Sequence, residues 1–263
     1  MKTVNMKSRS VRAKTPAAQR TMARFLQAAE SIFGRHGYEG TIVRDIAARS
    51  GVNLGTLKHY WGSKRKLFRD LIERRLRPIH TEALSRLAAL DPRLTGGGLP
   101  DAAAVAACLV EPAFLVGVQS PPDFDFSAMA ARRRFHLFFG RVLTDPSRDI
   151  VQDTNEMFAD VTNQFFELMR LACPDLSRAE LDWRINCVFG TVTFAQLYGE
   201  RIGRFVGAEA DVCDDLASQW VMHFLTGGIA ARPLIASRAL RSTRTAATRP
   251  RIERKATNKR KRR

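Results

Sequence analysis

Two short helical segments separated by a four-residue turn restrict what this chain can fold into more than any other feature of its sequence. The segments cover residues 42–49 and 54–61, and the turn between them reads Ser-Gly-Val-Asn. Within the turn, Gly51 suits a left-handed backbone position, Val52 can fill the space between the helices, and Asn53 can cap the second helix. This spacing predicts a helix-turn-helix.

A longer amphipathic helix precedes this motif, and another helix follows it. Thr15 can cap the first of these, and Pro16 is tolerated at a first helical position. Up to Arg35 the apolar residues recur in steps of three and four, which predicts one buried face. These residues are Met22, Phe25, Leu26, Ala29, Ile32 and Phe33. After a break at Gly62, Ser63 can cap the helix that follows.

The remainder has helical periodicity and no alternating strand pattern of useful length, so we predict an all-α protein. The architecture would be an N-terminal three-helix helix-turn-helix domain followed by a larger helical domain. Pro78 and Pro112 fall inside two of the expected helices, where we expect a kink or a helix end. The expected helices lie near residues 63–90, 101–117, 128–143, 146–173, 177–204 and 210–227.

The positive charge of the chain is concentrated at its two ends. The net charge is +17, yet residues 81–231 carry twenty Asp and Glu against twelve Lys and Arg. We expect a flexible basic arm at residues 1–15 and, where large apolar side chains are few, a disordered basic tail at residues 232–263. Residues 16–78 would form the helix-turn-helix domain, and residues 79–231 the larger domain. Basic charge beside one small domain favours a polyanionic partner.

Several classes of protein are disfavoured by what the sequence lacks. No apolar run approaches the roughly 18 residues of a membrane-spanning helix, and the first residues lack a secretory signal, so we expect a cytoplasmic protein. The four cysteines are scattered, which favours reduced core thiols over a disulfide or a zinc site. No Walker loop or G-x-S-x-G elbow occurs, and we therefore expect no enzyme, no catalytic residue, no cofactor and no metal.

The second short helix has little to bury apart from Leu57 and Trp61, and most of its other side chains are polar or cationic. Its exposed tips, among them Lys58 and His59, would suit the major groove of DNA. The helix after it opens with Lys-Arg-Lys at residues 64–66. Cations are unfavourable at a helix N-terminus unless an anion such as a DNA phosphate lies there. An ordinary solvated charged turn is the other interpretation of these three residues.

The segment from Gln19 to Arg77 resembles the DNA-binding domain of the TetR family of bacterial transcriptional regulators. The resemblance runs through AAESIFGRHGYEGTIVRDIAARSGVNLGTLKHYWGSKRKLF. The family most often has Tyr in place of Lys58 and Phe in place of Trp61. The resemblance implies phosphate contacts, and for a few residues proximity to base edges. The implied DNA-contacting positions are Thr41, Arg44, Thr56, His59, Tyr60 and Lys64, with Leu54, Gly55 and Lys58 closest to the bases.

The larger domain is rich in phenylalanine, which suits a helical bundle around an apolar cavity. The residues from 138 to 197 also resemble, more weakly, the fatty-acid-responsive branch of the family, which implies a small apolar effector. Three arginines at residues 132–134 could hold an acidic head group or form a solvated charged face. The candidate ligand-binding residues are Phe135, Phe139, Phe158, Phe165 and Phe189.

The TetR resemblance further implies a homodimer formed through the last two long helices, near residues 177–204 and 210–227. Each carries an apolar stripe that one layer of a bundle need not cover. The stripes are Leu181, Ile185, Val188, Phe189 and Val192 in the first helix, and Val212, Leu216, Trp220 and Phe224 in the second.

We therefore expect a ligand-responsive DNA-binding regulator. In the simplest form it is a repressor that a small apolar effector releases from a pseudo-palindromic operator. The alternative is a protein that coats double-stranded DNA without regard to sequence, which the basic tail alone could support.

Overall fold

The chain folds into helices throughout the part that the structure describes. The structure is a computed structural model in which residues 15–115, 128–205 and 214–233 are described. Within these ranges there are ten helices and no strand, which confirms the all-α prediction. The helices are α1 (Pro16–His36), α2 (Val43–Ser50), α3 (Gly55–Tyr60), α4 (Lys64–Leu90), α5 (Pro92–Thr95), α6 (Ala102–Leu115), α7 (Ala128–Thr144), α8 (Arg148–Ala172), α9 (Arg178–Phe205) and α10 (Asp214–Ile229).

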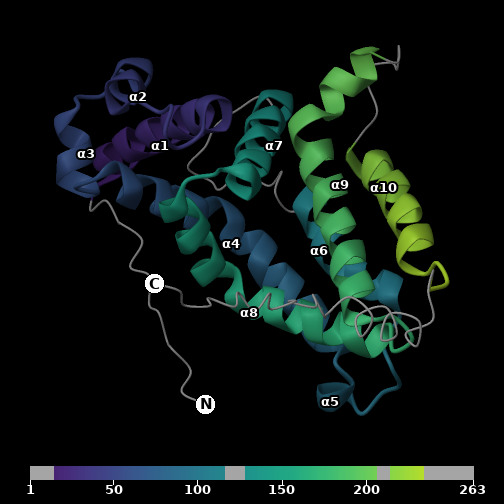
Figure 1. The fold of residues 1–263 in the computed structure, drawn as a ribbon. Helices are drawn as coiled ribbons and strands as arrows, with labels where there is room; N and C mark the ends of the chain where they lie inside the picture. Colours follow the sequence, from purple (N-terminus) through teal and green to yellow (C-terminus); the bar gives the residue numbers. More distant parts are fainter. Residues whose placement is uncertain (1–14, 116–127, 206–213, 234–263) are drawn as a thin grey trace, which may run out of the picture.

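Helices α1 to α3 form a small bundle at one end of the molecule (Figure 1). As predicted, the Thr15 hydroxyl caps α1 by accepting a hydrogen bond from the Ala18 amide at 3.2 Å. The expected apolar face is buried, and Phe25 and Phe33 have no exposed surface. Phe33 packs edge-on against Phe68 of α4, with ring centroids 4.2 Å apart, so the core of the small bundle continues into the next helix.

Helix α4 runs without interruption from this small bundle into the larger half of the molecule (Figure 1). Of the two expectations for Pro78, a kink or a helix end, the helix end is wrong, because α4 continues to Leu90. The apolar residues on both sides of the proline, Leu76 and Ile79, are buried, and this packing outweighs the loss of one backbone hydrogen bond. Pro112 likewise lies inside α6 and does not end it.

The larger half is a layered arrangement around α4. Helix α8 packs along α4, α6 lies against both α4 and α10, and α10 is also next to α9. Helix α7 is held between α1 and α9. Its approach to α1 is so close that a Cβ atom on Gly34 would lie 3.1 Å from the backbone nitrogen of Phe138. The two halves are therefore joined by α4 along one side and by the α1–α7 contact along another.

The predicted helix boundaries agree closely with the observed ones from α6 to α9. The short helix α5 was not predicted. Residues 1–14 of the expected basic arm at residues 1–15 lie outside the described residues, as does almost all of the expected tail at residues 232–263. Among the described helices, none combines the length and the apolar character needed to traverse a bilayer.

Candidate nucleic-acid interface

The turn between α2 and α3 has the geometry that the sequence predicted. Gly51 has φ 62° and ψ 27°, a left-handed conformation, and closes α2 through its backbone N–H. This backbone conformation favours glycine, and a Cβ at this position would also lie 2.7 Å from the Nη2 atom of Arg24, whose side chain would have to shift. The Asn53 side chain accepts a hydrogen bond from the Gly55 amide at 2.7 Å, which fixes the start of α3.

Helix α3 is attached to the bundle by its inner face alone. Leu57 is the buried residue of this six-residue helix. Trp61, directly after it, is 3% exposed and stacks on Phe25 with ring centroids 5.5 Å apart. The indole nitrogen of Trp61 donates a hydrogen bond to Asp70 at 2.9 Å. The interpretation of Trp61 as a core residue is thus confirmed, and its indole adds a polar anchor that the sequence did not reveal.

The outer face of α3 carries the polar tips expected of a recognition helix. Helix α3 lies at the margin of the molecule (Figure 1). Leu54, Gly55, Lys58 and His59 are exposed, and so is Arg44 in the first turn of α2. Thr56 and Tyr60 are half-buried beside them. The predicted contact residues on α2 and α3 thus keep part or all of their surface exposed.

Thr41 and Lys64 are placed differently from the other predicted contact residues. Thr41 is 2% exposed, and its hydroxyl donates a hydrogen bond to the Gly37 carbonyl at 2.6 Å. The Lys64 ammonium donates to the carbonyls of Tyr38 and Thr41 and lies 4.4 Å from the centre of the Tyr38 ring. Both side chains therefore organise the loop between α1 and α2 from within.

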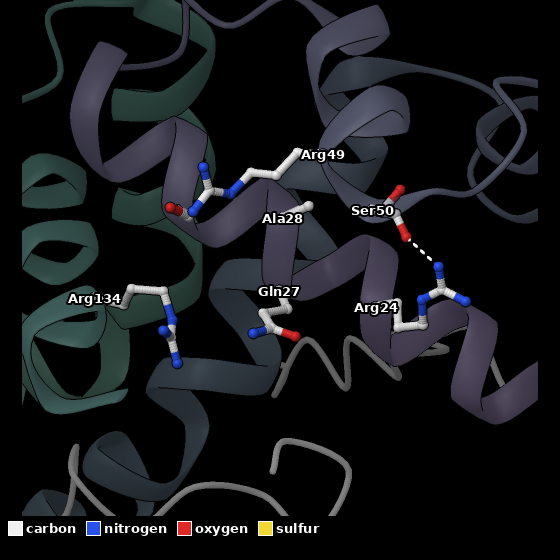
Figure 2. Close-up of a pocket in the computed structure, with 7 residues that line it drawn as sticks. Arg24, Gln27, Ala28, Arg49, Ser50 and Arg134 are labelled. Carbon is white, nitrogen blue, oxygen red and sulfur yellow. Dashed lines mark hydrogen bonds between the residues drawn. The ribbon is translucent and has the colours of Figure 1, made fainter. Parts of the chain in front are cut away.

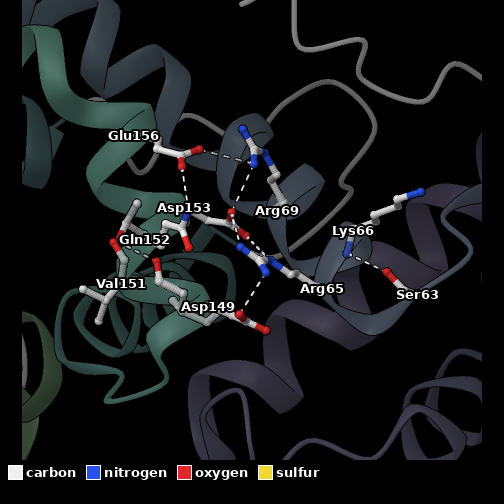
Figure 3. A network of polar contacts seen from close by, with 11 residues as sticks. Ser63, Arg65, Lys66, Arg69, Asp149, Val151, Gln152, Asp153 and Glu156 are labelled. Atoms are coloured by element: carbon white, nitrogen blue, oxygen red, sulfur yellow. Dashed lines mark hydrogen bonds and ion pairs between the residues drawn. The ribbon is translucent and has the colours of Figure 1, made fainter.

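Of the three cations at residues 64–66, Lys64 and Arg65 have partners within the chain. Arg65 points to α8, where it forms ion pairs with Asp149 at 2.8 Å and with Asp153 at 3.0 Å (Figure 3). The hydrogen bond to Asp153 raises the pKa of the Arg65 guanidinium. Arg69, one turn further, reaches the same Asp153 carboxylate at 3.1 Å. Arg65 thus links the start of α4 to α8, because its guanidinium forms ion pairs with two α8 carboxylates.

A second link joins the loop after α1 to the start of α8. Asp145 is buried and accepts a hydrogen bond from the Tyr38 backbone N–H at 2.7 Å and from the Ser147 N–H at 3.0 Å. The carboxylate thus connects a loop of the small bundle with the turn between α7 and α8. Together with the Arg65 network, it holds the small bundle against the larger half.

The five phenylalanines proposed as ligand-binding residues lie in the hydrophobic core or packed against it. Phe135 and Phe139 stack on each other within α7, with centroids 5.7 Å apart. Phe165 of α8 packs against Phe189 of α9 at 6.2 Å, and Phe158 packs against His80 of α4. Among the described residues, no ring contact joins the α7 pair with the α8–α9 group.

The exposed apolar face of α9 is not the one that the sequence suggested. Leu181, Ile185, Val188 and Val192 are all buried within the chain's own core, because this stripe packs inward. Among the described side chains of α9, the large apolar ones that face outward are Trp183, Phe194 and Tyr198, which are 73%, 52% and 40% exposed. On α10, Trp220 and Phe224 are exposed as expected, whereas Val212 lies outside the described residues and the side chain of Leu216 is not described.

Taken together, a helix-turn-helix with an exposed recognition helix, joined to a larger helical domain, defines a DNA-binding transcriptional regulator. Residues 25–71 match the family model of bacterial regulatory proteins, tetR family, and residues 121–228 match the model of the tetracyclin repressor-like C-terminal domain. The chain belongs to the TetR family. The function predicted from the sequence, a ligand-responsive DNA-binding repressor, is confirmed at the level of this family, and the DNA-coating alternative is not favoured.

Solved structures share the fold of the chain at low sequence identity. The fatty acid degradation regulator FadR from Bacillus halodurans is 18% identical, with a TM-score of 0.53, over 84% of this chain and 100% of that one. A putative fatty acid metabolism regulator from Clostridium perfringens is 16% identical, with a TM-score of 0.50, over 78% and 96%. A mutant of HlyIIR is 16% identical, with a TM-score of 0.50, over 82% and 99%. No curated protein matches the chain in sequence.

Proposed function

We propose that the chain acts as a homodimer whose two α3 helices enter successive major grooves of a pseudo-palindromic operator, roughly 34 to 36 Å apart. The observation that carries this proposal is the placement of α3. Leu57 and Trp61 hold it from inside, while Lys58 and His59 face outward. In this assignment Lys58 reaches a guanine edge or a phosphate, and Arg44 and Tyr60 contact phosphates.

The dimer in this proposal forms through the outward faces of α9 and α10, which lie side by side (Figure 1). Trp183, Phe194 and Tyr198 recur along α9, with Phe194 and Tyr198 in ring contact at 5.1 Å. Trp220 and Phe224 lie one turn apart on α10 and are 56% and 71% exposed. Exposed aromatic side chains at this density are typical of an oligomer interface. Two copies of this two-helix face would form a four-helix contact.

The effector in this proposal is a small apolar molecule bound among the helices of the larger domain. Phe158, Phe165 and Phe189 line the region where α8 meets α4 and α9, and two neighbours of similar fold are regulators of fatty acid metabolism. A ligand that displaces α8 would act on Asp149 and Asp153, and through them on Arg65 at the start of α4. The expected coupling to DNA affinity is about 1 to 3 kcal/mol.

As part of the same proposal, the helix-turn-helix domain covers residues 16–78 and the larger domain begins at residue 79. The protein would work in the cytoplasm, where its DNA is. The boundary falls within α4, so the helix itself is the connection between them.

Operator binding by the full chain tests the assignment of α3. Operator fragments are first selected from the source genome, and affinity is then measured by gel shift at fixed salt for the native chain and for Lys58→Ala. The substitution should weaken operator binding about tenfold, in line with the loss of one direct contact. Arg178→Ala is the matched control, because it removes one cation from a 78% exposed side chain at the start of α9. Equal affinities of the two variants would refute the assignment.

A further inference from the structure

A pocket of about 340 Å³ lies where the small bundle meets α7, and neither the recognition helix nor the proposed effector site uses it (Figure 2). Helices α1, α2 and α7 all contribute to its wall, so the pocket spans both halves of the molecule. Its lining residues are Arg24, Gln27, Ala28 and Ser31 of α1, Arg49 and Ser50 of α2, and Arg134 of α7.

The charge of this pocket is entirely positive. Three of the seven lining residues are arginines, and none is acidic. The nearest buried acid, Glu30, is in an ion pair with Arg75 at 2.9 Å. Burial lowers the pKa of the Arg134 guanidinium, and the charges of Arg75 and Arg49 lower it further, against the opposite effect of Glu30. The cations thus lie close enough to disfavour one another, which an anion between them would relieve.

A buried hydroxyl in the wall is available to a ligand. Ser31 is 5% exposed, and its Oγ atom has no hydrogen-bond partner among the described residues. Most buried polar groups are hydrogen-bonded, and an unsatisfied one costs about 1 to 3 kcal/mol. Gln27 adds an amide to the same wall, and Arg24 is held in place by donating a hydrogen bond to the Ser50 carbonyl at 2.6 Å (Figure 2).

We propose that this pocket binds a small phosphate-bearing anion. Guanidinium groups form charge-assisted, often bidentate hydrogen bonds to phosphate oxygens, and a phosphate has enough oxygens to engage several arginines and a hydroxyl together. A carboxylate, with two oxygens, could engage fewer of these groups at once. The volume lies at the lower end of the range of small-molecule sites, roughly 300 to 1,000 Å³.

The phosphate is not assigned to operator DNA. Arg49 and Ser50 are the last residues of α2, whereas Arg44 in its first turn belongs to the DNA-facing surface. The rise of an α-helix separates residues 44 and 50 by about 9 Å along the axis. The other walls belong to α1 and α7, and α7 is part of the larger half. A bound anion would therefore connect the halves, and its binding does not depend on the proposed operator or effector.

The test is calorimetric titration of the full chain with inorganic phosphate and with pyrophosphate at constant ionic strength. Arg49→Gln and Arg134→Gln should each weaken phosphate binding at least tenfold. Ser31→Ala, which changes no charge, should weaken it about threefold. Arg133→Gln is the matched control, since this exposed neighbour of Arg134 on α7 does not line the pocket. Circular dichroism confirms that each variant is folded, and Arg49, being exposed, is the substitution least disruptive to packing.

Three results would overturn the proposal. Equal phosphate affinity of Arg49→Gln and Arg133→Gln would show that the anion binds elsewhere, for example to the basic tail. Binding of acetate or succinate as tight as that of phosphate would refute the phosphate assignment. A loss of affinity for random duplex DNA in Arg49→Gln as large as its loss for phosphate would assign the pocket to the DNA-binding surface.

Discussion

Replacing Asp153 by Asn should loosen the attachment of the helix-turn-helix to α8. The Asp153 side chain is 1% exposed and accepts hydrogen bonds from Arg65 at 3.0 Å and from Arg69 at 3.1 Å (Figure 3). Asn keeps the shape but removes the charge, which leaves two guanidinium groups facing a neutral amide.

The expected loss in the free energy of unfolding follows from how deeply the carboxylate and the two guanidinium groups are buried. Removing one partner of a fully buried ion pair costs 3 to 5 kcal/mol, whereas a surface pair contributes 0 to about 1 kcal/mol. Here the carboxylate is buried while the Arg65 and Arg69 side chains are 38% and 31% exposed. We therefore expect a loss of about 2 kcal/mol in the free energy of unfolding. For a chain of this size that corresponds to roughly 4 to 8 °C in Tm.

The assay is thermal unfolding at a fixed protein concentration, because unfolding of an oligomer depends on concentration. Glu156→Gln is the control, since Glu156 is 43% exposed and 3.8 Å from Arg69, and it should cost less than about 0.5 kcal/mol. A double-mutant cycle with Arg65→Gln should give a coupling energy different from zero. Strict additivity in that cycle, or a Tm of Asp153→Asn equal to that of the control, would show that Asp153 does not attach the helix-turn-helix to α8.

Three further predictions concern the small bundle and the thiols. Gly51→Ala should destabilise the chain by about 1 to 2 kcal/mol in denaturant unfolding, because alanine is strained at φ 62° and its Cβ would meet Arg24; an unchanged midpoint would contradict the observed turn. Trp61→Phe keeps an aromatic ring but removes the hydrogen bond to Asp70, and should cost about 1 to 2 kcal/mol in the same assay; an unchanged midpoint would contradict a contribution of this bond. Burial raises the pKa of the Cys108 thiol to about 11, so at pH 8 it remains protonated and should react with a disulfide reagent far more slowly in the folded chain than in denaturant; Cys108→Ser should therefore remove no fast-reacting thiol from the folded chain, and the loss of one would contradict this burial.

The sequence was most informative where function depends on local chemistry. A left-handed glycine, an apolar plug and a capping side chain follow one another at residues 51–53, so the turn and the exposed recognition helix could be predicted from a few neighbouring residues. Leu57 and Trp61 could be assigned to the core because a helix so short has few other apolar side chains to bury.

The sequence was least informative where a contact joins distant parts of the chain. Arg65 meets Asp153 across 88 positions, and no local pattern distinguishes such an arginine from one that faces a phosphate. On α9 two apolar faces compete, and the more regular one, which includes Leu181 and Ile185, packs inward. The arginine pocket was missed because three different helices contribute to it.

The unbroken course of α4 determines how the two halves can move. A helix of 27 residues is about 40 Å long, so a tilt of 5° at one end displaces the other by about 3.5 Å. A tilt of α4 as a rigid rod can therefore change the separation between the two α3 helices of the proposed dimer without any local unfolding. Pro78 lacks a backbone N–H and so removes one hydrogen bond from the helix, which makes it the point at which α4 bends most easily.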